Sequence, residues 1–80
     1  MNIKQAAAWI AKKAMEAGLV LSIRRQTIGV EMLVFTVSAD DCHSAQGITL
    51  KEMAQDNAPE ILDARWRVAL DNMELWLARN

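Results

Sequence analysis

A continuous helical pattern from Asn57 to Arg79 constrains the fold more than any other feature of this sequence. Asn57 is a favourable N-cap residue, Glu60 lies three residues later as in a capping box, and Pro59 lies in the first turn, where its missing N–H costs little. A helix of about 22 residues is about 33 Å long. Because a small domain does not readily cover a rod of that length, its last turns are expected to protrude or to pair with another chain.

Two apolar stripes run along this predicted helix. The wider stripe is the expected core face and contains Leu62, Trp66, Ala69, Leu70, Met73, Trp76 and Leu77. The second stripe lies off that face and consists of Ile61, Val68 and Leu75, which are seven residues apart. It either packs under the rest of the fold or forms a protein interface. A homodimer built by two such helices across a two-fold axis would bury it.

The size and composition of the chain predict one small globular domain. Residues 1–80 are expected to form that domain with modest stability, so that oligomerisation or a partner would help it. Apolar residues make up 52% of the chain and charged residues 24%, which is typical of a folded protein. A single cysteine allows no internal disulfide, and no apolar run is long enough to cross a membrane. A cytoplasmic location is therefore expected.

The N-terminal segment predicts a helix from Asn2 to Ala17. Asn2 and Gln5 have the spacing of a capping box, and Gly18 is a typical C-terminal stop. The apolar stripe of this helix is mostly alanine, so its axis can approach a neighbouring element closely. Trp9 lies off the stripe. It either covers the edge of the core or is an exposed binding anchor, a role in which tryptophan is enriched.

An alternating pattern predicts a β-hairpin, with strands from Leu19 to Arg25 and from Val30 to Ser38 joined by a turn at Gln26–Gly29. A four-residue loop would place Arg24 opposite Glu31 as a cross-strand ion pair. A two-residue turn would shift the register but keep the same residues on each face. In both registers each face carries apolar side chains, so both faces are expected to need cover.

A capping box at Thr49 and Glu52 predicts a short helix before the long one, and Ser38–Gly47 is a candidate for another. The predicted fold class is therefore α+β, in the order helix, two-stranded antiparallel hairpin, short helix and long C-terminal helix (α-β-β-α-α), with the helices packed on the hairpin. The two open edges of the hairpin are either shielded, one of them by the segment after Ser38, or available to a strand from another chain.

Charge is unevenly distributed along the chain, although the net charge is only −1. Between Asp40 and Asp63 six acidic residues are accompanied by one basic residue, Lys51. This acidic segment is either a solvated surface or a contact for a basic partner. Together with the apolar candidates, the predicted partner-binding residues are Trp9, Ile61, Val68, Leu75, Asp40, Asp41, Asp56 and Glu60.

Nucleic-acid binding is an alternative that would use the basic residues of the first half of the chain, namely Lys12, Lys13, Arg24 and Arg25. The two lysines lie towards the end of the first helix and the two arginines near the hairpin tip. The lack of a positive net charge, and of aromatic residues between the basic ones, argues against strong binding to a phosphate backbone.

Residues 40–43, Asp-Asp-Cys-His, are the one cluster of metal-ligating residue types in the sequence. A structural zinc site needs four spaced ligands, and this cluster offers one cysteine beside one histidine. A nucleophilic cysteine needs a histidine that the fold positions, commonly from a distant part of the chain. We therefore expect no metal, no cofactor and no enzymatic activity.

These features favour a non-enzymatic protein-interaction module that binds and regulates or inhibits a larger partner. A homodimeric accessory protein is a further alternative. In scale and in its lack of a catalytic motif the chain resembles the small inhibitors and accessory proteins that phages and mobile elements encode, anti-CRISPR proteins among them. The resemblance is one of general type and transfers no site. It implies that the acidic segment or the Trp9 face contacts a nucleic-acid-handling complex.

Overall fold

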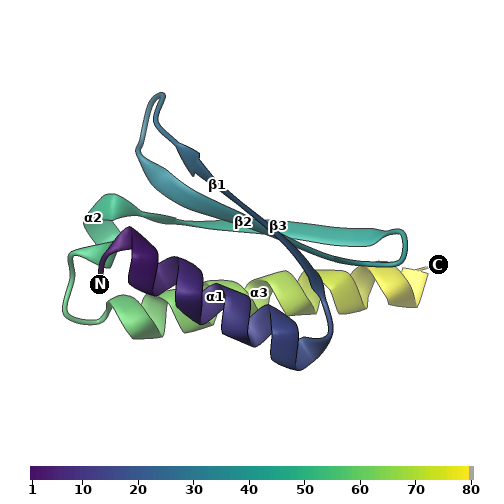
Figure 1. Ribbon diagram of the computed structural model, residues 1–80. Helices are drawn as coiled ribbons and strands as arrows, with labels where there is room; N and C mark the ends of the chain where they lie inside the picture. The colour runs from purple at the N-terminus through teal and green to yellow at the C-terminus, as the bar shows by residue number, and fades with distance from the viewer. Residues whose placement is uncertain (80) are drawn as a thin grey trace.

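The computed structural model describes residues 1–79, with the side chains of Leu77 and Arg79 excepted. One face of an antiparallel sheet is covered by two helices, which makes a two-layer α+β fold (Figure 1). The third, short helix lies at one end and joins the layers. The elements in chain order are α1 (Ile3–Ala17), β1 (Val20–Gln26), β2 (Met32–Ala39), β3 (Cys42–Thr49), α2 (Leu50–Met53) and α3 (Ala58–Arg79).

The capping signals read from the sequence are confirmed at α1 and α2. At α1 the side chain of Asn2 accepts a hydrogen bond from the Gln5 backbone, Gln5 bonds back, and Gly18 ends the helix with a left-handed φ of 68°. At α2 the side chains of Thr49 and Glu52 make the same reciprocal bonds. These local hydrogen bonds satisfy backbone donors that a helix N-terminus leaves unpaired, so they fix where each helix begins.

The core lies between the sheet and the two long helices, around Phe35 of the central strand β2. The Phe35 ring stacks on that of Trp66 from α3, with ring centroids 6.1 Å apart and an interplanar angle of 29°. Ile10 of α1, Ile48 of β3 and Leu62 of α3 are fully buried around this pair. Helices α1 and α3 and strands β2 and β3 therefore all contribute large side chains to one core.

The prediction of a two-stranded hairpin is wrong, because the described residues form a three-stranded sheet in the order β1-β2-β3. The segment Ser38–Gly47, a candidate helix from sequence, instead completes β2 and forms most of β3. A two-residue turn joins the strands, with Ala39 opposite Cys42 and Asp40 at a positive φ of 54°. Aspartate tolerates that conformation, which tight hairpin turns require.

The predicted register of the first hairpin is also wrong. Arg24 lies opposite Val34 rather than Glu31, and the connecting loop spans residues 27–31. Relative to both predicted registers, the observed register shifts β2 along β1 by an odd number of residues. The side chains of β2 that were expected on one face of the sheet therefore lie on the other face. Most of the apolar side chains that the two strands bury consequently lie on one face. The buried or half-buried members of that face are Leu21, Ile23, Leu33, Phe35 and Val37.

Within residues 1–79, the helices cover that face of the sheet and leave the other one open (Figure 1). The other face mixes polar side chains, among them Ser22, Thr36 and Arg24, with the apolar Val20, Met32 and Val34. Such a face can remain in water, as is common for antiparallel sheets. The expectation that both faces need cover is therefore wrong, and the register is the reason.

This assignment of faces predicts different outcomes for two alanine substitutions in β2. Leu33→Ala removes a buried side chain and should lower the free energy of unfolding by about 2–5 kcal/mol. Thr36→Ala acts on the open face and should change it by no more than about 0.5 kcal/mol. Urea denaturation followed by circular dichroism measures both values. Equal costs for the two variants would contradict the register.

Candidate protein interface

The second apolar stripe of α3 emerges from the fold along its length. Ile61, near the start of the helix, is half-buried and packs against the core. Val68 is 43% exposed and Leu75 is 58% exposed. We call Ile61, Val68 and Leu75 the outer row. Its first member is partly covered by its own subunit, and its other two members offer the larger apolar surface to a partner.

Trp76, which the sequence assigns to the core face, is 49% exposed. With Asp41 and His43 it lines a small hollow of about 160 Å³. The thiol of Cys42, the first residue of β3, lies 3.6 Å from the Met73 carbonyl. The following turn of α3, which carries Trp76, therefore lies beside the turn between β2 and β3 (Figure 1). Leu77 was predicted to share the core face, and its side chain lies outside the described residues.

The outer edge of β3 can be assigned from three hydrogen bonds. The Leu50 backbone N–H donates to Glu31 on the β2 side. Because successive residues of a strand direct their backbone groups to opposite sides, Gly47 and Thr49 face away from β2. Their observed partners agree: the Gly47 carbonyl accepts from Arg65, and the Thr49 N–H donates to Glu52. His43 and Ala45 share this outward direction.

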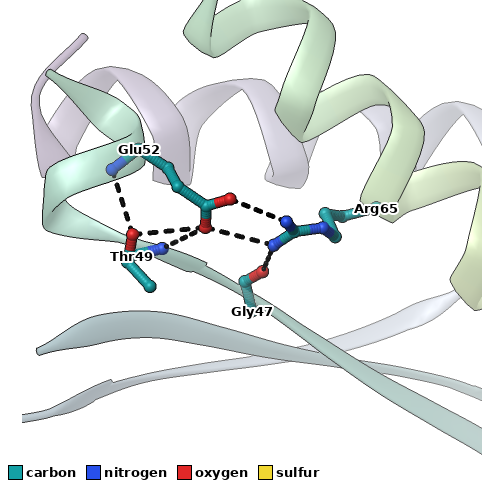
Figure 2. Close-up of polar contacts among 4 residues, drawn as sticks. All are labelled: Gly47, Thr49, Glu52 and Arg65. Atoms are coloured by element: carbon teal, nitrogen blue, oxygen red, sulfur yellow. Dashed lines mark hydrogen bonds and ion pairs between the residues drawn. The ribbon is translucent and has the colours of Figure 1, made fainter. Parts of the chain in front are cut away.

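At one half of this edge, side chains bond to the outward backbone groups (Figure 2). Arg65 donates to the Gly47 carbonyl at 2.8 Å and makes an ion pair with Glu52 at 2.7 Å. We call this arrangement the Arg65–Glu52 pair. It occupies the edge at Gly47 and Thr49, whereas among residues 1–79 no strand pairs with the outer side of His43 and Ala45. Both of these residues are exposed.

The Arg65–Glu52 pair lowers the pKa of the Glu52 carboxyl. The hydrogen bond from the Arg65 guanidinium is the largest cause, followed by the bond from the Thr49 backbone N–H. Both favour the charged carboxylate over the neutral acid, while partial burial opposes them. The pair thus joins α2, α3 and the end of β3 by charge-assisted hydrogen bonds.

Trp9 covers the edge of the core, one of the two roles considered from the sequence. Its ring is half-buried and lies edge-on to Trp66, with centroids 6.4 Å apart and an interplanar angle of 89°. The Lys13 ammonium lies 5.3 Å from the centre of the same ring. Trp9 therefore links α1 to α3 and leaves only part of its surface for a partner.

The predicted acidic candidates do not form one surface. Asp40 and Asp41 are exposed in the turn between β2 and β3, whereas Asp56 and Glu60 are exposed around the start of α3. These two places lie at opposite ends of the molecule (Figure 1). Of the four, Asp41 lines the hollow with Trp76, the residue that follows Leu75.

The basic candidates for nucleic-acid binding are also dispersed. Arg24 lies on the open face of the sheet, and Arg25 points to the other face, where it pairs with Glu31 at 3.3 Å. Lys12 is exposed on α1. The hairpin tip and the end of α1 lie at opposite ends of β1 (Figure 1). These residues do not present the continuous basic surface that tracks a phosphate backbone.

The structure separates the two residues in the sequence that most resemble catalytic groups. Cys42 is buried, and its thiol faces the Met73 carbonyl. His43 points to the opposite side of β3 and is exposed. Within the described residues, no three His, Cys, Asp or Glu side chains are grouped so that they could hold a metal ion.

Two exposed features were missed by the sequence reading. The tip of the β1–β2 hairpin presents Ile28, which is 88% exposed, and Val30. The open edge of β3 was missed because the segment was considered as a helix. The apolar–polar alternation of β3 is weak. Its positions on the helix-covered face include the polar Ser44 and Gln46, and its positions on the open face include Ala45 and Gly47.

Comparison with protein-family models, with curated proteins and with solved structures finds no match to this chain. Within residues 1–79 no helix combines the length and the apolar character needed to cross a bilayer. The geometry of the surface therefore carries the functional interpretation.

The lowered pKa of Glu52 predicts a pH-dependent stability. The contribution of the pair should be fully present above the ordinary pKa of 4.5 and should be lost as the pH falls through the lower pKa of the folded state. Glu52→Gln should cost on the order of 1 kcal/mol at neutral pH and less at about pH 3. Urea denaturation at both pH values measures the difference. Glu74→Gln, on an exposed position of α3, is the control, and an equal cost of Glu52→Gln at both pH values would contradict the assignment.

Proposed function

We propose that this chain is a non-enzymatic protein-interaction module that binds another protein chain through the outer flank of the molecule. The outer flank consists of the outer row of α3 (Ile61, Val68 and Leu75) and the open residues of β3 (His43 and Ala45). The exposure of Val68 and Leu75 on α3, the helix whose Arg65 bonds to the edge strand β3, is the observation that carries the proposal.

Two kinds of contact are available on this flank. Val68 and Leu75 offer apolar area, whose removal from water favours association. The outward N–H and C=O groups of His43 and Ala45 offer main-chain hydrogen bonds to an extended segment, as in proteins that recognise a strand by adding it to a sheet. One partner would be able to contact the apolar side chains of α3 and the backbone groups of β3 together.

A larger target that the module regulates or inhibits is one occupant of this flank. Covering a working surface of such a target needs no catalytic group, and a rigid two-layer fold would hold the flank in one shape. A second copy of the chain, as in a homodimeric accessory protein, is the other occupant. Both require the same residues to be buried in a complex.

Site-specific photo-crosslinking tests whether the flank binds protein. A benzophenone amino acid placed at Leu75 or Val68 should give a covalent adduct with another polypeptide in extracts of the native host, because these side chains would be buried in the complex. Gel electrophoresis and mass spectrometry detect the adduct and its mass.

The matched control places the same amino acid at Met15, which is exposed on α1 away from the flank. Adducts from the two flank positions, and not from Met15, would support the proposal. Absence of flank adducts, or equal adducts from all three positions, would contradict it.

A further inference from the structure

We infer that the occupant of the outer flank in the isolated chain is a second copy, related by a two-fold axis that pairs β3 with β3 and α3 with α3. The inference rests on the proposed function, since it names a partner for the same surface. It follows from the relative positions of the strand edge and the outer row.

The contacts between β3 and α3 define their alignment. Arg65 bonds to Gly47 at one end, and Met73 meets Cys42 at the other, so α3 runs antiparallel to β3. Ala45 stands two residues from Gly47 and three from Cys42, and Val68 stands three residues from Arg65 and five from Met73. Each is about two-fifths of the way between the two contacts. Ala45 and Val68 are therefore level with one another.

Each of these residues is also the midpoint of its own symmetric set. Ile61 and Leu75 lie seven residues before and after Val68. His43 and Gly47, which share the outward direction of Ala45, lie two residues before and after it. A single two-fold axis beside Ala45 and Val68 consequently serves both elements, as an isologous interface requires.

The pairing that this axis generates is complementary along its length. Antiparallel β3 strands centred on Ala45 place each Ala45 opposite the partner's Ala45, and His43 opposite the partner's Gly47. The Gly47 carbonyl has a second lone pair, so it can accept a bond while it keeps Arg65. On the helices, Val68 meets the partner's Val68, and Leu75 meets the partner's Ile61.

Charge supports a second copy as the occupant. In this register the acidic turn of Asp40 and Asp41 lies beside the start of the partner's α2, where Lys51 is exposed. The arrangement repeats across the axis, so each copy supplies one acidic and one basic contact. The dimer has a continuous six-stranded sheet with both α3 helices on one side.

The test measures the mass of the purified chain by analytical ultracentrifugation over a range of concentrations. We expect a species of twice 8.9 kDa. Ala45→Pro removes an outward N–H and leaves the bonds between β2 and β3 in place, as proline on an edge strand allows. It should weaken dimerisation at least about tenfold, and Val68→Glu, which buries a charge at the axis, should do the same.

Two controls accompany these variants. Ala45→Thr keeps the N–H and Val20→Glu adds a charge on β1 away from the axis, so both should dimerise as the unaltered chain does. Circular dichroism confirms that each variant is folded, and because Val68 is exposed on a helix, its substitution tests the interface even where Ala45→Pro unfolds the chain. A purified chain that stays monomeric at millimolar concentration, or a dimer indifferent to Val68→Glu, would overturn the inference.

The crosslinking experiment separates the two proposals. A flank adduct with a different protein, together with a monomeric purified chain, would overturn the dimer and retain the interaction module. A flank adduct of twice the chain mass supports both. No flank adduct and a monomeric chain would overturn both.

Discussion

The stacking of Phe35 on Trp66 joins the sheet to the long helix, and the other packing follows from it. Phe35 lies on the central strand β2, and the face of the sheet to which its ring points is the face that the helices cover. Trp66 fixes the rotation of α3, which directs Leu62 and Ala69 inwards and leaves Val68 outside. Trp9 then closes the gap between the helices against the same indole. The contact of Trp66 with the sheet therefore determines which side of α3 is exposed.

The helices could be predicted from the sequence because their signals are local. Asn2 with Gln5, Thr49 with Glu52, and Gly18 each act within one turn of their own helix. The register of the first hairpin could not be derived in the same way, because it depends on which face the distant helices cover. Strand β3 was harder still. Its inner face holds Cys42, Ser44 and Gln46 beside Ile48, and so lacks the apolar alternation by which a half-buried strand is recognised.

The candidate interface was predicted in part. The period of seven in Ile61, Val68 and Leu75 was visible in the sequence, and the exposure of the last two agrees with a stripe that lies off the core. The neighbouring strand edge was not visible, since it exists only once β3 has formed beside β2. The dispersal of the acidic and basic candidates depends equally on tertiary structure. Residues that are close in the sequence, such as Asp41 and Asp56, are carried to opposite ends by β3.

The projecting loop at residues 27–31 has a practical consequence. It extends past the helices with Ile28 almost fully in water, while at its base the Glu31 carbonyl accepts a hydrogen bond from the Leu50 N–H (Figure 1). Loop tips of this kind tolerate insertions and are the first places that proteases cut. A fluorescent domain or an affinity tag spliced into this loop would leave both α3 and the edge of β3 unobstructed.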